Sequence, residues 1–152
     1  MTLKTITDSS AILTDETFED NDLISLANKG IARINTDCNT LFPFYKSLNE
    51  EYKAFPDNLQ LDLISNYISY GIKMNDSSLT EANMYLDEFY KSLSTFQDRL
   101  GTLVDNYKNG DEENGISPDY IDKNGFGGVF GIDTSGAVNI GFFGSNSNGG
   151  SF

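Results

Sequence analysis

Apolar residues recur at spacings of three and four in three stretches of the chain, which is the period of an amphipathic helix. The first stretch begins at Asp20 or Asn21, either of which can cap a helix, and its apolar stripe ends at Cys38. The second follows Pro56, and the third covers residues 79–107 with an aromatic-rich stripe. The pattern predicts a body of three main helices. The short connection between the last two favours antiparallel packing.

The stripes also predict which side chains are buried. Gly30 interrupts the first stripe, where we expect a close contact between helices, and Cys38 at its end reads as a small core residue. Ser78 and Glu81 have the spacing of a capping box for the third helix. Six large side chains are expected to be largely buried: Leu63, Tyr67, Ile68, Tyr85, Phe89 and Phe96.

The segment between the first two helices, residues 39–55, has no helical period. Its pattern fits either a hairpin or an irregular chain. It is rich in aromatic residues, which we expect to cover the end of the bundle: Phe42, Phe44, Tyr45, Tyr52 and Phe55.

After residue 108 the character of the chain changes, because eleven of its 14 glycines lie between Gly110 and Gly150. Residues 109–115 indicate a charged turn or linker. Residues 129–132 and 137–143 read as two short strands joined by a tight turn. The fold class predicted is mainly α: a small helical bundle with one long C-terminal helix and then a glycine-rich tail with short β-strands. We divide the chain into an N-terminal arm (1–20), a helical body (21–108) and this tail (109–152).

The apolar side chains of the tail are candidates for a partner interface. A lone hairpin is marginally stable in water, and its phenylalanines would be exposed unless something covered them. We therefore expect the tail strands to pair with another chain; the alternative is that the tail folds back on its own helices. The interface residues predicted are Phe126, Val129, Phe130, Ile132, Val138, Ile140, Phe142 and Phe143.

Composition argues against catalysis and against binding of nucleic acid. The formal charge is −13, so the attraction to phosphate on which most nucleic-acid binding depends is missing. There is no His, and the one Cys cannot form an intrachain disulfide. Gly125 and Gly127 lack the register of a phosphate loop. Asp122 and Asn124 begin a calcium-loop pattern that is not completed. We expect no enzymatic activity, no cofactor and no bound metal. We also expect no membrane span and no signal peptide.

The order of these features resembles the head–tail connector (adaptor, head completion) proteins of long-tailed bacteriophages. An acidic arm leads into the helix DNDLISLANKGIARINTDCN, and an irregular stretch follows. FPDNLQLDLISNYISYGIKMND then begins with Pro56-Asp57 and ends in the polar turn Asn75-Asp76, before the long aromatic-rich helix. The resemblance covers roughly residues 15–105. The glycine-rich tail is longer than the family pattern.

The resemblance implies a structural virion protein. It implies a homo-oligomeric ring of twelve subunits in the neck, assembled in the host cytoplasm, which binds the portal protein and the head-closure or tail-completion proteins. DNA would pass through the lumen without sequence-specific binding, and an acidic wall suits that passage because it repels phosphate. Two alternatives stay open: another neck component, such as a head-closure or tail-completion protein, and a small helical cytosolic binding protein or chaperone.

Overall fold

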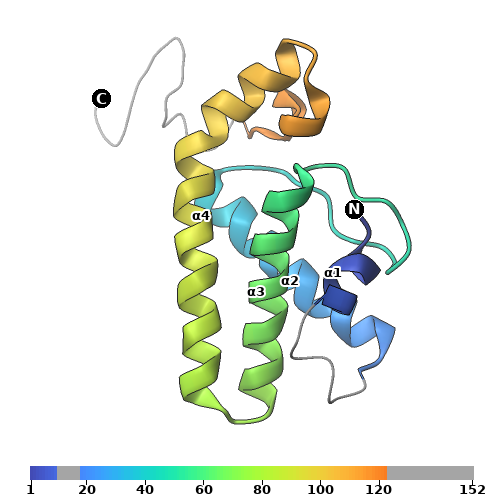
Figure 1. The fold of residues 1–152 in the computed structure, drawn as a ribbon, viewed down its shortest axis with the longest axis vertical. Helices are drawn as coiled ribbons and strands as arrows, with labels where there is room; N and C mark the ends of the chain where they lie inside the picture. Colours follow the sequence, from blue (N-terminus) through green and yellow to red (C-terminus); the bar gives the residue numbers. More distant parts are fainter. Residues whose placement is uncertain (10–17, 123–152) are drawn as a thin grey trace.

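The structure is a computed structural model that describes residues 1–9 and 18–122. Within these ranges the chain is mainly helical, as the sequence predicted, and the two expected tail strands lie outside them. Figure 1 shows α3 and α4 as an antiparallel pair, with α2 packed against α3. The elements are α1 (Leu3–Ser9), α2 (Asp20–Cys38), α3 (Asp57–Asn75) and α4 (Leu79–Lys108), followed by the short 3₁₀ helices η2 (Glu112–Asn114) and η3 (Pro118–Tyr120). No helix in the described ranges is long and apolar enough to cross a membrane.

Two glycines allow α2 and α3 to pack closely. A Cβ atom at Gly30 would lie 3.1 Å from Cγ of Tyr67, and one at Gly71 would lie 2.4 Å from Cδ2 of Leu26. The close helix contact predicted at Gly30 is therefore confirmed. Gly71 makes the reciprocal contact, because a side chain of α2 fills the space above it.

The expected core is largely confirmed. Four of the six side chains predicted to be buried are so: Leu63, Ile68, Phe89 and Phe96. Tyr67 and Tyr85 are buried in part, and Tyr67 packs against the core. The Tyr67 ring packs edge-on against Phe89, with 5.0 Å between the ring centroids, while Arg33 lies near its hydroxyl. A tyrosine at such a boundary buries its ring and keeps its polar tip near water.

The helix ends differ from those expected. The N-cap of α2 is Glu19, so Asp20 is the first helical residue rather than the cap. In the described part of the chain, Ser78 makes no side-chain capping bond to α4, and its ψ of 71° is not the extended value of a typical cap. Glu81, the expected capping-box partner, lies 3.5 Å from the Lys73 ammonium instead.

The helix α1 was not predicted from the sequence. Leu3 and Ile6 are fully buried, and the Lys4 N–H donates to the Leu48 carbonyl over 2.9 Å. With two apolar positions in seven residues, α1 is too short to show a helical period. The predicted arm thus contains a segment that belongs to the core.

The chain after α4 folds back on that helix as far as Asp122. The Ile116 N–H donates to the Leu103 carbonyl over 3.0 Å, and Ile116 is fully buried. A Cβ atom at Gly115 would lie 2.5 Å from the backbone nitrogen of Tyr107. Residues 109–122, which the sequence assigned to the tail, are therefore packed against the helical body rather than forming a free linker.

Candidate interaction surface

Two asparagines of α2 hold the extended segment that follows the helix. Asn35 Nδ2 donates to the Phe42 carbonyl over 3.0 Å, and its Oδ1 accepts from the Phe42 N–H over 2.9 Å. Asn28 makes the same pair of bonds to Tyr45, at 3.0 Å and 2.7 Å. Each side-chain amide thus satisfies the donor and the acceptor of one backbone residue, as a neighbouring strand would.

The spacing of these four residues explains why the two bond pairs can coexist. Asn28 and Asn35 are seven residues apart, which is about 10.5 Å along an α-helix. Phe42 and Tyr45 are three residues apart, which is roughly 10 Å in an extended chain. Burial repeats with the same period, because Phe42 and Tyr45 are buried whereas Leu41 and Phe44, one residue before each, are exposed. The segment therefore runs antiparallel to α2 with the same backbone face toward the helix at both points.

The same three-residue period leaves two apolar side chains on the outside. Leu41 is 58% exposed and Phe44 is 54% exposed. Phe42 points inward instead, and its ring lies 4.4 Å from that of Phe55 between centroids. The expectation that Phe44 covers the end of the bundle is wrong, because its place in the period turns it outward. It is confirmed for the four buried aromatic residues of the segment: Phe42, Tyr45, Tyr52 and Phe55.

The last described residues lie beside the start of this segment. The Leu41 N–H donates to the Tyr120 carbonyl over 2.7 Å, and the Asp122 N–H donates to the Asn39 carbonyl over 3.0 Å. Thr40 and Ile121 form an antiparallel bridge between them. At Asp122 the chain is therefore heading from Leu41 toward Asn39. This direction leads away from Phe44.

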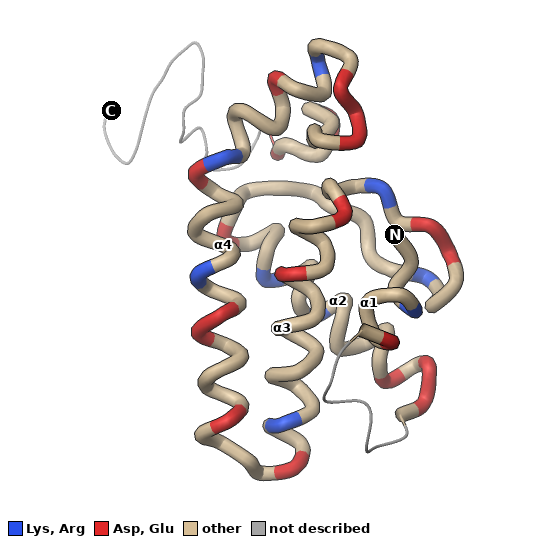
Figure 2. Tube along the Cα trace, in the orientation of Figure 1, with Lys and Arg blue, Asp and Glu red and all other residues tan. Residues whose placement is uncertain are grey.

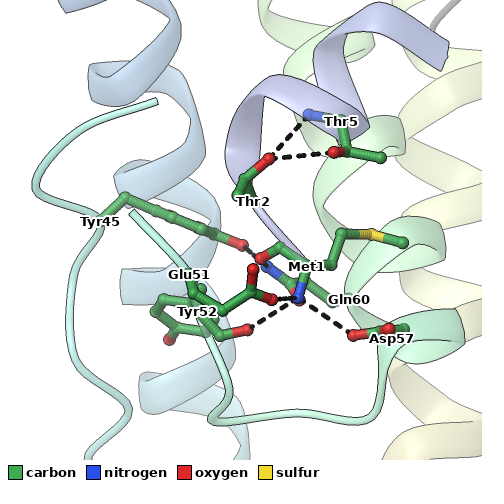
Figure 3. A network of polar contacts seen from close by, with 8 residues as sticks. All are labelled: Met1, Thr2, Thr5, Tyr45, Glu51, Tyr52, Asp57 and Gln60. Carbon is green, nitrogen blue, oxygen red and sulfur yellow. Dashed lines mark hydrogen bonds and ion pairs between the residues drawn. The ribbon is translucent and has the colours of Figure 1, made fainter. Parts of the chain in front are cut away.

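A buried polar network fixes the segment from inside (Figure 3). Gln60 Nε2 donates to the Tyr45 hydroxyl over 2.7 Å and to the Met1 carbonyl over 3.3 Å. Tyr45 stacks on Tyr52 with 4.3 Å between ring centroids, and the Tyr52 hydroxyl donates to the Pro43 carbonyl over 2.7 Å. Burial raises the pKa of both tyrosines above the usual range, so both act as neutral hydroxyls.

The amino group of Met1 closes one side of the network. It contacts the Glu51 carboxylate and lies 3.2 Å from the Asp57 carboxylate. Partial burial lowers its pKa, but hydrogen bonds to the two carboxylates outweigh this effect, and the pKa is raised. These groups border a cleft of about 600 Å³ whose charged lining is mainly acidic: Met1, Glu51, Lys53, Asp57, Glu112 and Glu113.

In residues 1–9 and 18–122 no group of three or more His, Cys, Asp or Glu side chains is placed to hold a metal ion. Burial, with a smaller contribution from Asp37, raises the pKa of the Cys38 thiol to about 12, so the reactive thiolate is scarce at neutral pH. The expectation that the protein is not an enzyme stays a prediction.

A second exposed apolar area lies on α4, near the turn that joins it to α3. Leu79 is 57% exposed and Met84 is 64% exposed. A shallow hollow there is lined by Met84, Asp87, Glu88, Tyr90, Lys91 and Ser94. Charged side chains are interspersed with the apolar ones on this face, whereas Leu41 and Phe44 flank a proline with no charge between them.

All eight interface residues predicted from the sequence lie outside the described residues: Phe126, Val129, Phe130, Ile132, Val138, Ile140, Phe142 and Phe143. Sequence reasoning did not find the surface formed by Leu41 and Phe44. The signal that could have revealed it is the proline within the run LFPFY, because a three-residue period separates inward from outward side chains there. Comparisons of the chain with protein-family models, with curated proteins and with solved structures found no match.

Proposed function

We propose that this protein is a structural subunit of a phage neck, a head–tail connector that forms a ring of twelve copies between the portal and the tail. The observation that carries the proposal is the order of the elements, which resembles that family. The helix α2 ends at Cys38, and an irregular stretch follows. The helix α3 begins directly after Pro56, and a short turn leads into the long α4. These bounds support the resemblance, which rests on the sequence.

The distribution of charge suits a subunit that surrounds passing DNA. Residues 123–152 contain one basic residue, Lys123, and one acidic residue, Asp133, so the whole formal charge of −13 resides in residues 1–122. Figure 2 shows acidic positions on α1, α2, α3 and α4. A wall of this sign repels phosphate and lets a duplex slide without adhering.

The test is the mass of the purified full chain, alone and with the portal protein encoded by the same genome. Twelve copies of a 16.8 kDa chain give an assembly of roughly 200 kDa. We expect a closed ring of one size, and a complex of that ring with the portal. A chain that stays monomeric at high concentration and does not bind the portal contradicts the proposal. If the ring instead bound the tail-side neck proteins and not the portal, a head-closure or tail-completion role would be favoured.

A truncated chain distinguishes the role of the helical body from the role of the tail. Deletion of residues 125–152 removes none of the described residues, so we expect unchanged helix content by circular dichroism and a nearly unchanged melting temperature. Attachment to partners should be lost, because the predicted interface residues lie in the deleted part. Loss of the fold, or normal attachment to the portal and the tail, would contradict this role for the tail.

A further inference from the structure

The side chains of Leu41 and Phe44 form an exposed apolar surface to which an apolar partner could bind. Both side chains are more than half exposed, and they stand three residues apart on the outer side of a segment whose inner side is fixed. Because Asn28 and Asn35 hydrogen-bond the backbone at Tyr45 and Phe42, a partner that docks here meets a surface that is already formed. Preorganisation lowers the entropic cost of binding.

We infer that Leu41 and Phe44 of each copy receive the glycine-rich tail, residues 125–144, of a second copy of this chain. The inference rests on the proposed function, in which copies stand side by side in a ring. It assigns to the tail a partner, the neighbouring subunit, and a docking site on it.

The end of the described chain identifies the tail as the occupant. Tyr120 to Asp122 already lie along Asn39 to Leu41, so the tail starts within a few residues of the exposed pair. Thirty further residues follow Asp122, and they include five phenylalanines. A partly extended chain of that length can span several tens of ångströms, since each residue spans up to about 3.3 Å.

The direction of the chain at Asp122 favours a second copy over the same one. At Asp122 the chain is heading away from Phe44, and the backbone edge of Asn39 and Leu41 is occupied by residues 120–122 of its own chain. A tail from the same copy would have to reverse its direction to reach Phe44. A tail from a neighbour can approach from the open side.

Charge also favours the tail as the contact between copies. Residues 1–122 carry the formal charge of −13, whereas residues 123–152 are neutral in sum. Two bodies of the same sign repel each other at close range. A neutral glycine-rich segment lies on an acidic neighbour without that cost, and its phenylalanines supply aromatic anchors.

This exchange produces a head-to-tail contact. Each copy gives its tail to the next copy and receives a tail from the previous one, and such heterologous contacts close into a ring when the rotation between neighbours allows it. The docking site and the tail are different surfaces of one chain, so each dimer still has one free docking site and one free tail. The assembly can therefore grow beyond two copies.

The test is disulfide cross-linking between differently tagged full-length chains. One chain carries Phe44→Cys, and the other carries Phe126→Cys, Phe130→Cys or Phe142→Cys, while the native Cys38 stays buried. We expect an interchain disulfide with at least one of the three tail positions. The matched control is Met84→Cys, which is 64% exposed on α4 and should not cross-link. The inference is overturned by equal cross-linking to Phe44→Cys and Met84→Cys, or by no interchain cross-link at any of the three tail positions. A further chain that carries Phe44→Cys together with a tail cysteine tests the same-copy alternative, and a disulfide that forms only within that single chain overturns the inference as well.

A second variant tests the apolar contact itself. The double substitution Leu41→Ser/Phe44→Ser changes two exposed side chains, so we expect an unchanged melting temperature. Self-association of the full chain, measured by sedimentation, should weaken by at least about tenfold with loss of the aromatic anchor. The control Leu79→Ser/Met84→Ser should leave it unchanged. Unaltered self-association of the first variant overturns the inference.

These outcomes are separable from those of the proposed function. Rings that bind the portal without a cross-link at Phe44 overturn the inference and leave the connector role intact. A cross-link at Phe44 in assemblies that do not bind the portal supports the inference and contradicts the connector role.

Discussion

The Asn28 side chain binds the backbone of Tyr45 in both directions, with its Nδ2 donating to the carbonyl over 3.0 Å and its Oδ1 accepting from the N–H over 2.7 Å. A helix normally offers no free backbone groups to a neighbouring extended chain, because its own ladder uses them. The asparagines of α2 supply the missing partners. Position in the helix, rather than the identity of the bound residue, therefore sets the register of the segment.

Replacing Asn28 by Ala should destabilise the protein by about 1–3 kcal/mol, because both backbone groups of the buried Tyr45 lose their partners. The measurement is the free energy of unfolding from urea denaturation. Asn66 is the control: its side chain donates to the Asp62 carbonyl of its own helix, and Asn66→Ala should change stability by less than about 0.5 kcal/mol. Equal effects of the two substitutions would contradict the role of the Asn28 amide.

Glycines 115 and 101 should respond in opposite directions to alanine. A Cβ atom at Gly115 would lie 2.5 Å from a backbone atom of α4, and Gly115→Ala should cost about 1–3 kcal/mol of overpacking. Gly101 lies within α4 with open space around it, so Gly101→Ala should stabilise the protein by about 0.5–1 kcal/mol. Thermal unfolding of both variants checks the sign. A stabilised Gly115→Ala protein would mean that residues 109–122 do not pack against α4.

Phe89 is the buried anchor of the contact between α3 and α4. It is fully buried, and Phe89→Ala should cost about 3–5 kcal/mol through lost burial and a residual cavity. On the same helix Met84 is 64% exposed, and Met84→Ala should stay within about 0.5 kcal/mol of the unmodified protein. A melting temperature unchanged by Phe89→Ala would rule out its place in the core.

The amino group of Met1 should make stability depend on pH in the alkaline range. Its pKa is raised in the folded state from an ordinary value of 8.0 by Glu51 and Asp57. The stabilising contribution is therefore complete below pH 8 and is lost as the pH rises through the folded-state pKa. Both carboxylates are more than half exposed, so solvent screening limits it to about 1 kcal/mol at most.

The check compares the chain that begins at Met1 with its N-acetylated form. Acetylation removes the charge, so the two forms should differ in urea midpoint at pH 7 and converge near pH 10. All other groups are the same in both forms, so their effects cancel in the difference. A difference that grows with pH would contradict the direction of the shift.

The helical part of the fold was predictable because its signals are local. Pro56 marks the start of α3, and the stripe through Phe89 and Phe96 defines α4 within one residue of its observed end. The extended segment was not predictable in this way, because its register depends on two asparagines in a preceding helix. The exposure of Phe44 follows from that register, since an aromatic residue in an apolar run otherwise reads as core.

The helix α1 and the start of α4 were harder to predict from the sequence. Leu3 and Ile6 are buried, and the chain around them bonds to residues far later in the sequence, with Lys4 donating to Leu48 and Tyr52 donating to Met1. No local pattern encodes such contacts. The capping box at Ser78 shows the opposite case, in which the local pattern is present but tertiary context overrides it: Glu81 pairs with Lys73 across the turn. The predicted tail interface, by contrast, rests on composition alone.

The hydrogen bond between Leu41 and Tyr120 also constrains the order of events during synthesis. The α3–α4 hairpin joins neighbouring stretches of sequence and can form as soon as α4 leaves the ribosome, because local contacts form fastest. The segment that carries Leu41 has no partner on that side until Tyr120 has been made, almost eighty residues later. In a nascent chain Asn28 and Asn35 can bind Tyr45 and Phe42 early, but the backbone edge at Asn39 and Leu41 stays unpaired until residues 120–122 have been made. A copy still on the ribosome accordingly lacks the finished Leu41 side of the surface, which would delay association between copies until residues 120–122 are free to pair.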